Sequence, residues 1–282
     1  MLLGFNLLLW TTHVTDEHLP LLKEIKRAGY DGVELPIFEG APEHFARIGQ
    51  AVRDEGLRCT AVTVLPDAGH DAIAADPTAR EGAARHLRWA VDCLEAAGGD
   101  VLCGPFHQPL GRFSGEPPTA EERTRLVEVH RGIAPHAQER GIGLSIEPLN
   151  RFECYVLNTL DDAAEVARQV GAPNYGVLYD SFHANIEEKD PVGAIQRHLG
   201  RINHVHLSEN DRGTPGKGHV PWAPTLRAFK RGGYQGWFVI EAFGRALPAL
   251  AAATRVWRDF FPSREEVYRE GHDFLRETWA KA

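Results

Sequence analysis

The sequence lacks several features that mark whole classes of protein. Its four cysteines, Cys59, Cys93, Cys103 and Cys154, are scattered along the chain without a Cys-x-x-Cys spacing. This pattern argues against a disulfide framework or a thiolate zinc motif, and it indicates buried, reduced thiols. No apolar run is long enough to span a membrane, and no basic segment precedes the apolar N-terminus. We therefore expect a cytoplasmic protein with no membrane partner.

Positive charge is also scarce. The chain carries 31 lysine and arginine residues against 39 aspartate and glutamate residues, a formal net charge of −8. Because DNA binding requires a basic face, this balance argues against a nucleic-acid partner. At 282 residues the chain exceeds the usual length of one domain. However, α/β barrels commonly reach this size, so we expect one catalytic domain over residues 1–282.

Glycine, by contrast, is frequent and regularly placed. Helix-like segments repeatedly stop at a glycine, such as Gly29, Gly141 or Gly171, and a short apolar run follows. Glycine favours the position just past a helix end because it adopts a positive φ without strain. Together with the opening segment, the pattern predicts eight strands, at residues 2–10, 32–35, 57–65, 100–106, 142–147, 175–180, 202–207 and 236–241.

Strands that alternate with helical segments indicate βαβ units and a parallel sheet. The runs are continuously apolar, as expected for strands covered on both faces. Eight such units in a chain of this length predict a (β/α)8 TIM barrel, with a doubly wound open sheet as the alternative. We also expect Thr15 to cap the first helix, Pro135 to bend or interrupt the helix over residues 121–141, and an additional C-terminal helix or helix pair over residues 263–282.

Residue types that bind metals stand at the ends of the last four predicted strands: Glu147, Asp180, His206 and Glu241. Each alone has an ordinary explanation, since a strand-end carboxylate often caps a helix and a strand histidine is often a core residue. In a barrel all four would meet at the C-terminal rim, where barrel active sites lie. Three carboxylates and one imidazole favour Mn²⁺, Mg²⁺ or Co²⁺ over a structural zinc site.

Two glutamates beside a metal are suited to moving a proton next to a carbonyl. The metal polarises the carbonyl and a neighbouring hydroxyl, which stabilises an enediolate. One glutamate removes a proton on one face of the substrate, and the other can return a proton on the opposite face, which inverts the carbon. This is the chemistry of an epimerase. Transfer to the adjacent carbon on the same face is the chemistry of an aldose–ketose isomerase.

Four sequence blocks in the second half of the chain carry a specific resemblance. They are IEPLNRFECYVLNT from residue 146, YDSFHANIEE from 179, HVHLSENDRGTPGKGHVPW from 204 and VIEAF from 239. In combination they resemble the ketose 3-epimerases (D-tagatose, D-allulose or D-psicose, and L-ribulose 3-epimerases) of the xylose-isomerase-like barrels. The resemblance implies a metal-dependent isomerase that inverts carbon 3 of free ketoses. It also implies Mn²⁺, with Co²⁺ or Mg²⁺ as alternatives, and a homodimer or homotetramer.

The same resemblance implies roles for single residues. Glu147 and Glu241 would be the paired acid and base as well as metal ligands, and Asp180 and His206 would complete the metal site. The implied substrate contacts are Glu153, His183 and Arg212, with Trp10 and Phe243 as apolar walls. Weaker substrate candidates are His107, Gln108 and Glu34, and we expect His204 to lie one layer deeper than His206.

The implied substrate contacts also have ordinary explanations. Glu153 could pair with Arg151, His183 could cap the next helix, and Arg212 could be a solvated loop charge like Lys217. Trp10 and Phe243 could be ordinary barrel packing.

Three other functions use related features. A hydroxypyruvate isomerase or an inosose dehydratase would share the metal and both glutamates, but the segments NRFECYVLNT and DRGTPGKGHVPW favour the epimerases. An endonuclease for abasic DNA shares this type of barrel but would need more histidines and a basic face. A sugar-binding barrel without catalysis is disfavoured because both glutamates are present. The motifs do not define the preferred ketose or the glutamate that serves each face.

Overall fold

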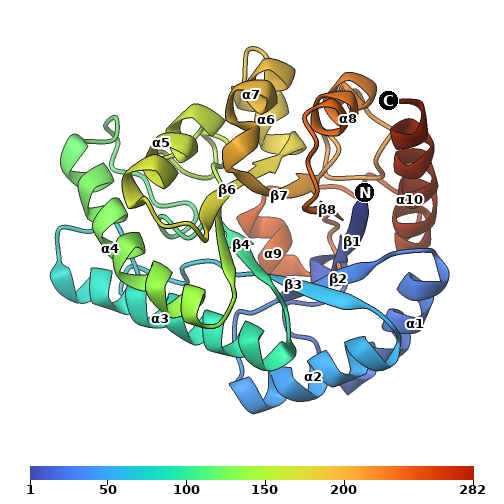
Figure 1. Ribbon diagram of the computed structural model, residues 1–282, viewed down its shortest axis with the longest axis horizontal. Helices are drawn as coiled ribbons and strands as arrows, with labels where there is room; N and C mark the ends of the chain where they lie inside the picture. Colours follow the sequence, from blue (N-terminus) through green and yellow to red (C-terminus); the bar gives the residue numbers. More distant parts are fainter.

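Eight parallel strands close into a barrel in which each strand pairs with its neighbours in sequence order, and β1 pairs with β8. The structure is a computed structural model that describes residues 1–282 (Figure 1). The strands are β1 (Leu2–Asn6), β2 (Gly32–Pro36), β3 (Arg58–Val62), β4 (Val101–Gly104), β5 (Gly143–Ile146), β6 (Tyr175–Asp180), β7 (Ile202–Leu207) and β8 (Trp237–Ile240). The predicted (β/α)8 TIM barrel is confirmed, and the open-sheet alternative is wrong.

Helices follow the strands along the chain, and most of them lie around the outside of the barrel (Figure 1). They are α1 (Leu19–Arg27), α2 (Pro42–Asp54), α3 (Pro77–Ala97), α4 (Ala120–Glu139), α5 (Leu160–Val170), α6 (Ser181–Glu187), α7 (Pro191–His198), α8 (Trp222–Arg231), α9 (Pro248–Ala253) and α10 (Arg264–Lys281), with short 3-10 helices η1 (Leu7–Leu9), η2 (Asp16–His18) and η3 (Leu199–Arg201). In this view α9 lies over the centre of the barrel, while α10 stands beside α8. None of the helices combines the length and apolarity needed to cross a membrane.

The additional C-terminal helix is confirmed as a single helix, α10, that packs on the barrel. The hydroxyl of Tyr30 donates to the carbonyl of Tyr268 at 2.8 Å, and Arg276 donates to the carbonyl of Met1 at 2.9 Å. Near the other end of the chain, Thr15 forms the expected N-terminal cap, together with His18. The capped segment is the 3-10 helix η2, which leads directly into α1.

Two local expectations are wrong. The first strand does not reach residue 10, because the side chain of Asn6 accepts a hydrogen bond from the backbone of Leu8 at 2.8 Å and turns the chain into η1. We expected Pro135 to bend or interrupt the helix α4, and the interruption is wrong, because the helix runs to Glu139. A proline removes only one backbone hydrogen bond, and buried residues on both sides of it, Ile133 and Ala137 among them, hold the helix against the barrel.

Candidate active site

The four predicted metal ligands converge at the C-terminal rim of the barrel. Glu147 follows β5, Asp180 ends β6, His206 lies in β7 and Glu241 follows β8. Asp180 and His206 are direct partners in the β6–β7 register. All four residues are buried, and one potential ligand atom from each lies within 4.8 Å of the others. Tertiary structure therefore brings together residues that are up to 94 positions apart in the chain, Glu147 and Glu241 being the two extremes.

The imidazole of His206 shows that this cluster suits a cation. Its Nδ1 atom lies 3.3 Å from Glu241 Oε1, 3.8 Å from Asp180 Oδ2 and 4.0 Å from Glu147 Oε1. This nitrogen is buried and has no hydrogen-bond partner. A buried polar atom without a partner is costly, and so is a group of buried carboxylates without a cation. Three carboxylates and one imidazole therefore form a cluster able to bind a divalent metal ion.

Arg212 is the nearest cation to these carboxylates. Its Nη1 donates to Glu241 Oε2 at 2.6 Å and to Asp180 Oδ2 at 3.1 Å, while Nη2 lies 2.8 Å from His183 Nε2. The residue is 3% exposed, so the interpretation of Arg212 as a solvated loop charge is wrong. Its backbone has a φ of 66°, a conformation that is uncommon for a residue other than glycine. Such backbone conformations often occur at functional sites.

Two aromatic rings hold the guanidinium of Arg212 in place. It stands 3.9 Å from the ring centroid of Phe182 and 4.8 Å from that of Phe243. Phe243 also lines the cavity beside the cluster, as expected for an apolar wall. Trp10 does not line this cavity, because it packs against Phe5 and Tyr268 at centroid distances of 5.2 and 6.0 Å.

Glu153 and His183 complete the polar end of the cavity. The amide of Asn150 donates to Glu153 Oε1 at 2.8 Å, and the backbone N–H of Asn150 donates to His183 Nδ1 at 3.0 Å. The other ring nitrogen of His183, Nε2, lies 3.7 Å from Glu147 Oε1. The pairing of Glu153 with Arg151 is not seen, since Arg151 forms an ion pair with Glu187.

The cavity has a volume of about 240 Å³ and two unlike ends. Its charged lining is Glu147, Glu153, His183, Arg212 and Glu241. Most of the remaining lining is apolar and comes from several loops and from α9, with Leu8, Phe38, Val64, Leu110, Leu149 and Leu250 among the larger side chains. A small polar ligand with one reactive end would place that end at the carboxylates.

Burial and charge act unequally on the two glutamates. Burial raises the pKa of Glu147 well above its usual range; His206 opposes this effect, and the carboxylates of Glu241 and Asp180 add to it. Burial also acts to raise the pKa of Glu241, but His206 and Arg212 outweigh it and hold that pKa below its usual range. For His183, burial and then the charge of Arg212 lower the pKa well below the ordinary value, so this imidazole is neutral.

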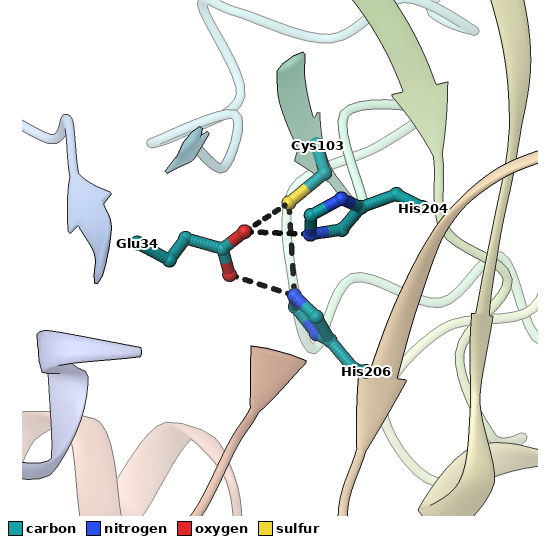
Figure 2. A group of neighbouring side chains, drawn as sticks. All are labelled: Glu34, Cys103, His204 and His206. Atoms are coloured by element: carbon teal, nitrogen blue, oxygen red, sulfur yellow. Dashed lines mark hydrogen bonds and ion pairs between the residues drawn. The ribbon is translucent and has the colours of Figure 1, made fainter. Parts of the chain in front are cut away.

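A second group of metal-binding residue types lies on the other side of the His206 ring. Figure 2 shows Glu34, Cys103 and His204 around the Nε2 edge of His206, and all four residues are buried. His204 lies one layer deeper than the cavity, as expected, with its Nε2 at 2.7 Å from Glu34 Oε2. Glu34 itself does not line the cavity, so its side chain is placed away from the region where we expected a substrate contact.

The weaker candidates lie outside the cavity. His107 is fully buried, and neither of its ring nitrogens has a hydrogen-bond partner. Gln108 connects two loops by hydrogen bonds, because its amide donates to the carbonyl of Arg112 and accepts from the backbone of Val156. Lys217 is exposed and forms an ion pair with Glu270 at 2.8 Å.

The sequence reasoning missed Asn6, which lies at the end of β1. Its Nδ2 atom donates both to Glu34 Oε1 at 3.0 Å and to Glu241 Oε1 at 3.2 Å. One signal could have found it, since Asn6 is the only polar side chain in the apolar segment over residues 2–10. The apolar lining of the cavity was also missed, and no sequence pattern distinguishes those leucines and valines from core residues.

Comparison with known proteins gives a consistent picture. The family model described as the xylose isomerase-like TIM barrel matches residues 22–278. A Synechocystis sp. protein named "Probable ketose 3-epimerase" is 32% identical, over 98% of this chain and 96% of that protein. The ketose 3-epimerase of Arthrobacter globiformis is 30% identical over the same shares. Among solved structures, the D-allulose 3-epimerase of Methylomonas sp. in complex with D-allulose has a TM-score of 0.92 and 27% identity, covering 99% of this chain and 97% of that one.

Proposed function

This chain belongs to the ketose 3-epimerase family of xylose isomerase-like TIM barrels, and we propose that it inverts carbon 3 of free ketoses. The main support is that Glu147 and Glu241 line the same cavity and belong to the cluster that is suited to a divalent cation. The names of the relatives support an enzyme that acts on sugars such as D-allulose and L-ribulose. D-Fructose and D-tagatose belong to the same substrate class.

Glu147, Asp180, His206 and Glu241 are the residues that would hold the metal, and we propose Mn²⁺, with Co²⁺ or Mg²⁺ as alternatives. When bound, the metal supplies Lewis-acid polarisation of the C2 carbonyl and of the neighbouring hydroxyl. The C3 proton is acidic because it stands next to that carbonyl. One of the two glutamates takes this proton, which leaves an enediolate, and the other returns a proton on the opposite face.

The other polar residues hold the substrate's reacting end. His183 and Arg212 lie 2.8 Å apart at this end of the cavity, where Arg212 offers a donor and Glu153 an acceptor. Phe243 forms one wall of the cavity. The apolar side chains at the other end exclude water from the carboxylates, which strengthens the electrostatic interactions within the site.

The loop after β7 supports a free sugar over a phosphorylated one. Glycine-rich loops at this position often bind phosphate in TIM barrels. In this loop, however, an internal carboxylate already accepts hydrogen bonds from N–H groups that could otherwise bind a phosphate. Glu209 accepts from the backbone of Gly216 at 2.8 Å, from the backbone of Val220 at 3.0 Å and from the indole of Trp222 at 2.8 Å. Lys217 points toward α10, where it pairs with Glu270.

We also propose that residues 1–282 act as one catalytic domain and that the enzyme is a homodimer or homotetramer. All four cysteines are free and buried, which is consistent with a reducing compartment such as the cytoplasm. Size-exclusion chromatography with light scattering would determine the number of subunits.

The function is tested by NMR of D-fructose, D-tagatose and L-ribulose, incubated in D₂O with the enzyme and Mn²⁺. We expect deuterium at C3 together with the C3 epimer, because the exchanged proton comes from solvent. Chelated enzyme is the control and should give neither product. Deuterium at C1 without label at C3 would indicate an isomerase instead. Turnover of the sugar phosphates alone would contradict the free-ketose assignment.

A further inference from the structure

The carboxylate of Glu34 is the centre of a hydrogen-bond layer below the proposed metal site. The residue is fully buried, and five donors from four other strands converge on it. Oε1 lies 2.7 Å from His206 Nε2 and 3.0 Å from Asn6 Nδ2; Oε2 lies 2.7 Å from His204 Nε2, 2.8 Å from Thr60 Oγ1 and 3.3 Å from Cys103 Sγ. Both oxygens are therefore occupied as acceptors, with no room for a proton of their own.

This layer decides which nitrogen of His206 carries the proton. An ionised carboxylate can only accept, so the nitrogen 2.7 Å from Glu34 Oε1 must donate. A neutral imidazole with its proton on Nε2 keeps a lone pair on Nδ1, and that atom faces Glu147, Asp180 and Glu241. The opposite tautomer would place a proton at Nδ1, where Glu241 Oε1 at 3.3 Å would accept it and the lone pair would be lost.

We propose that Glu34 is a positioning residue that keeps the proton of His206 on Nε2 and thereby keeps its Nδ1 free to bind the metal. This inference rests on the metal site of the proposed function, but not on the identity of the sugar. A carboxylate that accepts from the outer nitrogen of a metal-binding histidine orients the ring and raises the basicity of the ligand.

Asn6 extends the same layer to a proposed catalytic residue. Its Oδ1 accepts from the backbone of Leu8 at 2.8 Å, so its NH₂ group must point into the barrel. The two N–H bonds reach Glu34 and Glu241, at 3.0 and 3.2 Å. One buried amide therefore sets the spacing between the positioning carboxylate and a carboxylate of the site.

The same four residues in Figure 2 have the composition of a zinc site, but their distances favour hydrogen bonds. Both imidazole nitrogens stand 2.7 Å from a Glu34 oxygen. Ligands held tetrahedrally around zinc at about 2.0–2.3 Å would stand roughly 3.3 Å or more from each other. With protons on both Nε2 atoms, the imidazoles have no lone pair to offer there.

Two substitutions of Glu34 separate positioning from packing. Glu34→Met removes the acceptor at similar size, so the His206 proton should move to Nδ1 and the Mn²⁺ dissociation constant should rise about 10–100-fold. Glu34→Gln keeps one oxygen, which can still accept from His206. The amide NH₂ of the glutamine then faces His204, which can accept at Nε2 by moving its own proton to Nδ1, an atom without a hydrogen-bond partner. We expect the affinity of this variant for Mn²⁺ to fall by less than about tenfold. Thr60→Val, which removes a donor to the other oxygen, is the control and should bind Mn²⁺ like the wild type.

The measurement is calorimetric titration of Mn²⁺ into stripped protein whose fold is verified by circular dichroism. Equal affinity of the Met and Gln variants would overturn the proposal, because packing alone would then explain Glu34. Should Glu34→Met not fold, ¹⁵N NMR of the Mg²⁺-loaded wild type still decides, since a proton on His206 Nδ1 would refute the assignment. Binding of two Zn²⁺ ions per chain, with the second lost in Cys103→Ser, would also overturn it. None of these readouts requires epimerase activity.

Discussion

Removing the guanidinium of Arg212 should destabilise the protein in a way that a metal ion can reverse. Arg212 is the nearest cation to Asp180 and Glu241, and its side chain is almost completely buried. Arg212→Met keeps an unbranched side chain between the rings of Phe182 and Phe243 but leaves both carboxylates without that charge. We therefore expect a large loss of stability in chelated protein and a small one in the presence of Mn²⁺.

The size of the loss follows from the burial of this ion pair. Removing one partner of a buried pair costs about 3–5 kcal/mol of folding free energy, because the remaining charge is uncompensated. At about 2.1 cal/mol/K per residue, a chain of 282 residues has an unfolding entropy of about 0.6 kcal/mol/K. The Tm of chelated Arg212→Met should therefore fall by about 5–8 °C. With saturating Mn²⁺ the carboxylates regain a cation, and the deficit should shrink to less than half.

Differential scanning calorimetry of both proteins, with chelator and with Mn²⁺, measures these shifts. Arg168→Met is the control, because Arg168 pairs with Glu165 and both side chains are exposed, at 59% and 45%. An exposed pair contributes about 0–1 kcal/mol, so this variant should lose no more than about 2 °C in either condition. The reasoning is refuted if chelated Arg212→Met has the same Tm as the chelated wild type, or if Mn²⁺ leaves the Tm difference between the two proteins unchanged.

Three further predictions follow from the site and its surroundings. Glu147→Gln and Glu241→Gln should each lose about 10²–10⁴-fold in turnover with an unchanged circular dichroism spectrum, and more than about a tenth of wild-type activity with metal bound would contradict the role of that glutamate. Exhaustive chelation should abolish turnover and Mn²⁺ or Co²⁺ should restore it, whereas full activity in protein shown to be metal-free by elemental analysis would contradict the metal site. Burial lowers the pKa of His130 in the folded protein to about 4, whereas its pKa in the unfolded chain is about 6.5. Between these two pH values only the unfolded state binds a proton at His130, so the free energy of unfolding falls by about 1.4 kcal/mol for each pH unit. Between pH 7 and pH 5, urea unfolding of His130→Gln should show a loss about 2 kcal/mol smaller than that of the wild type, and equal losses would show that His130 does not carry this effect.

Several features of this protein follow from the sequence alone. The glycines at helix ends and the continuous apolar runs predicted eight parallel strands, and all eight are present. These signals are local, since each depends only on the φ preference of one residue or on the burial of a short segment. The strand-end positions of Glu147, Asp180, His206 and Glu241 were also sufficient to predict that they meet, because parallel strands in a barrel end at one rim.

Other features were decided only by the tertiary structure. Arg212 looks like any charged residue in a glycine-rich loop, and its burial depends on Phe182 and Phe243, which come from other segments. Trp10 was expected to form a wall of the cavity, but it packs against Phe5 and Tyr268 instead.

The layer around Glu34 is the clearest case. Asn6 and Glu34 are each the only polar side chain of their strand, and nothing nearby in the sequence identifies their partners. Hydrogen bonds are short and directional, so which oxygen meets which nitrogen is set by the barrel's register and by side-chain packing across its interior. The sequence pattern determines which strands form and which residues face the rim. Only the closed barrel determines that Asn6 and His206 donate hydrogen bonds to Glu34.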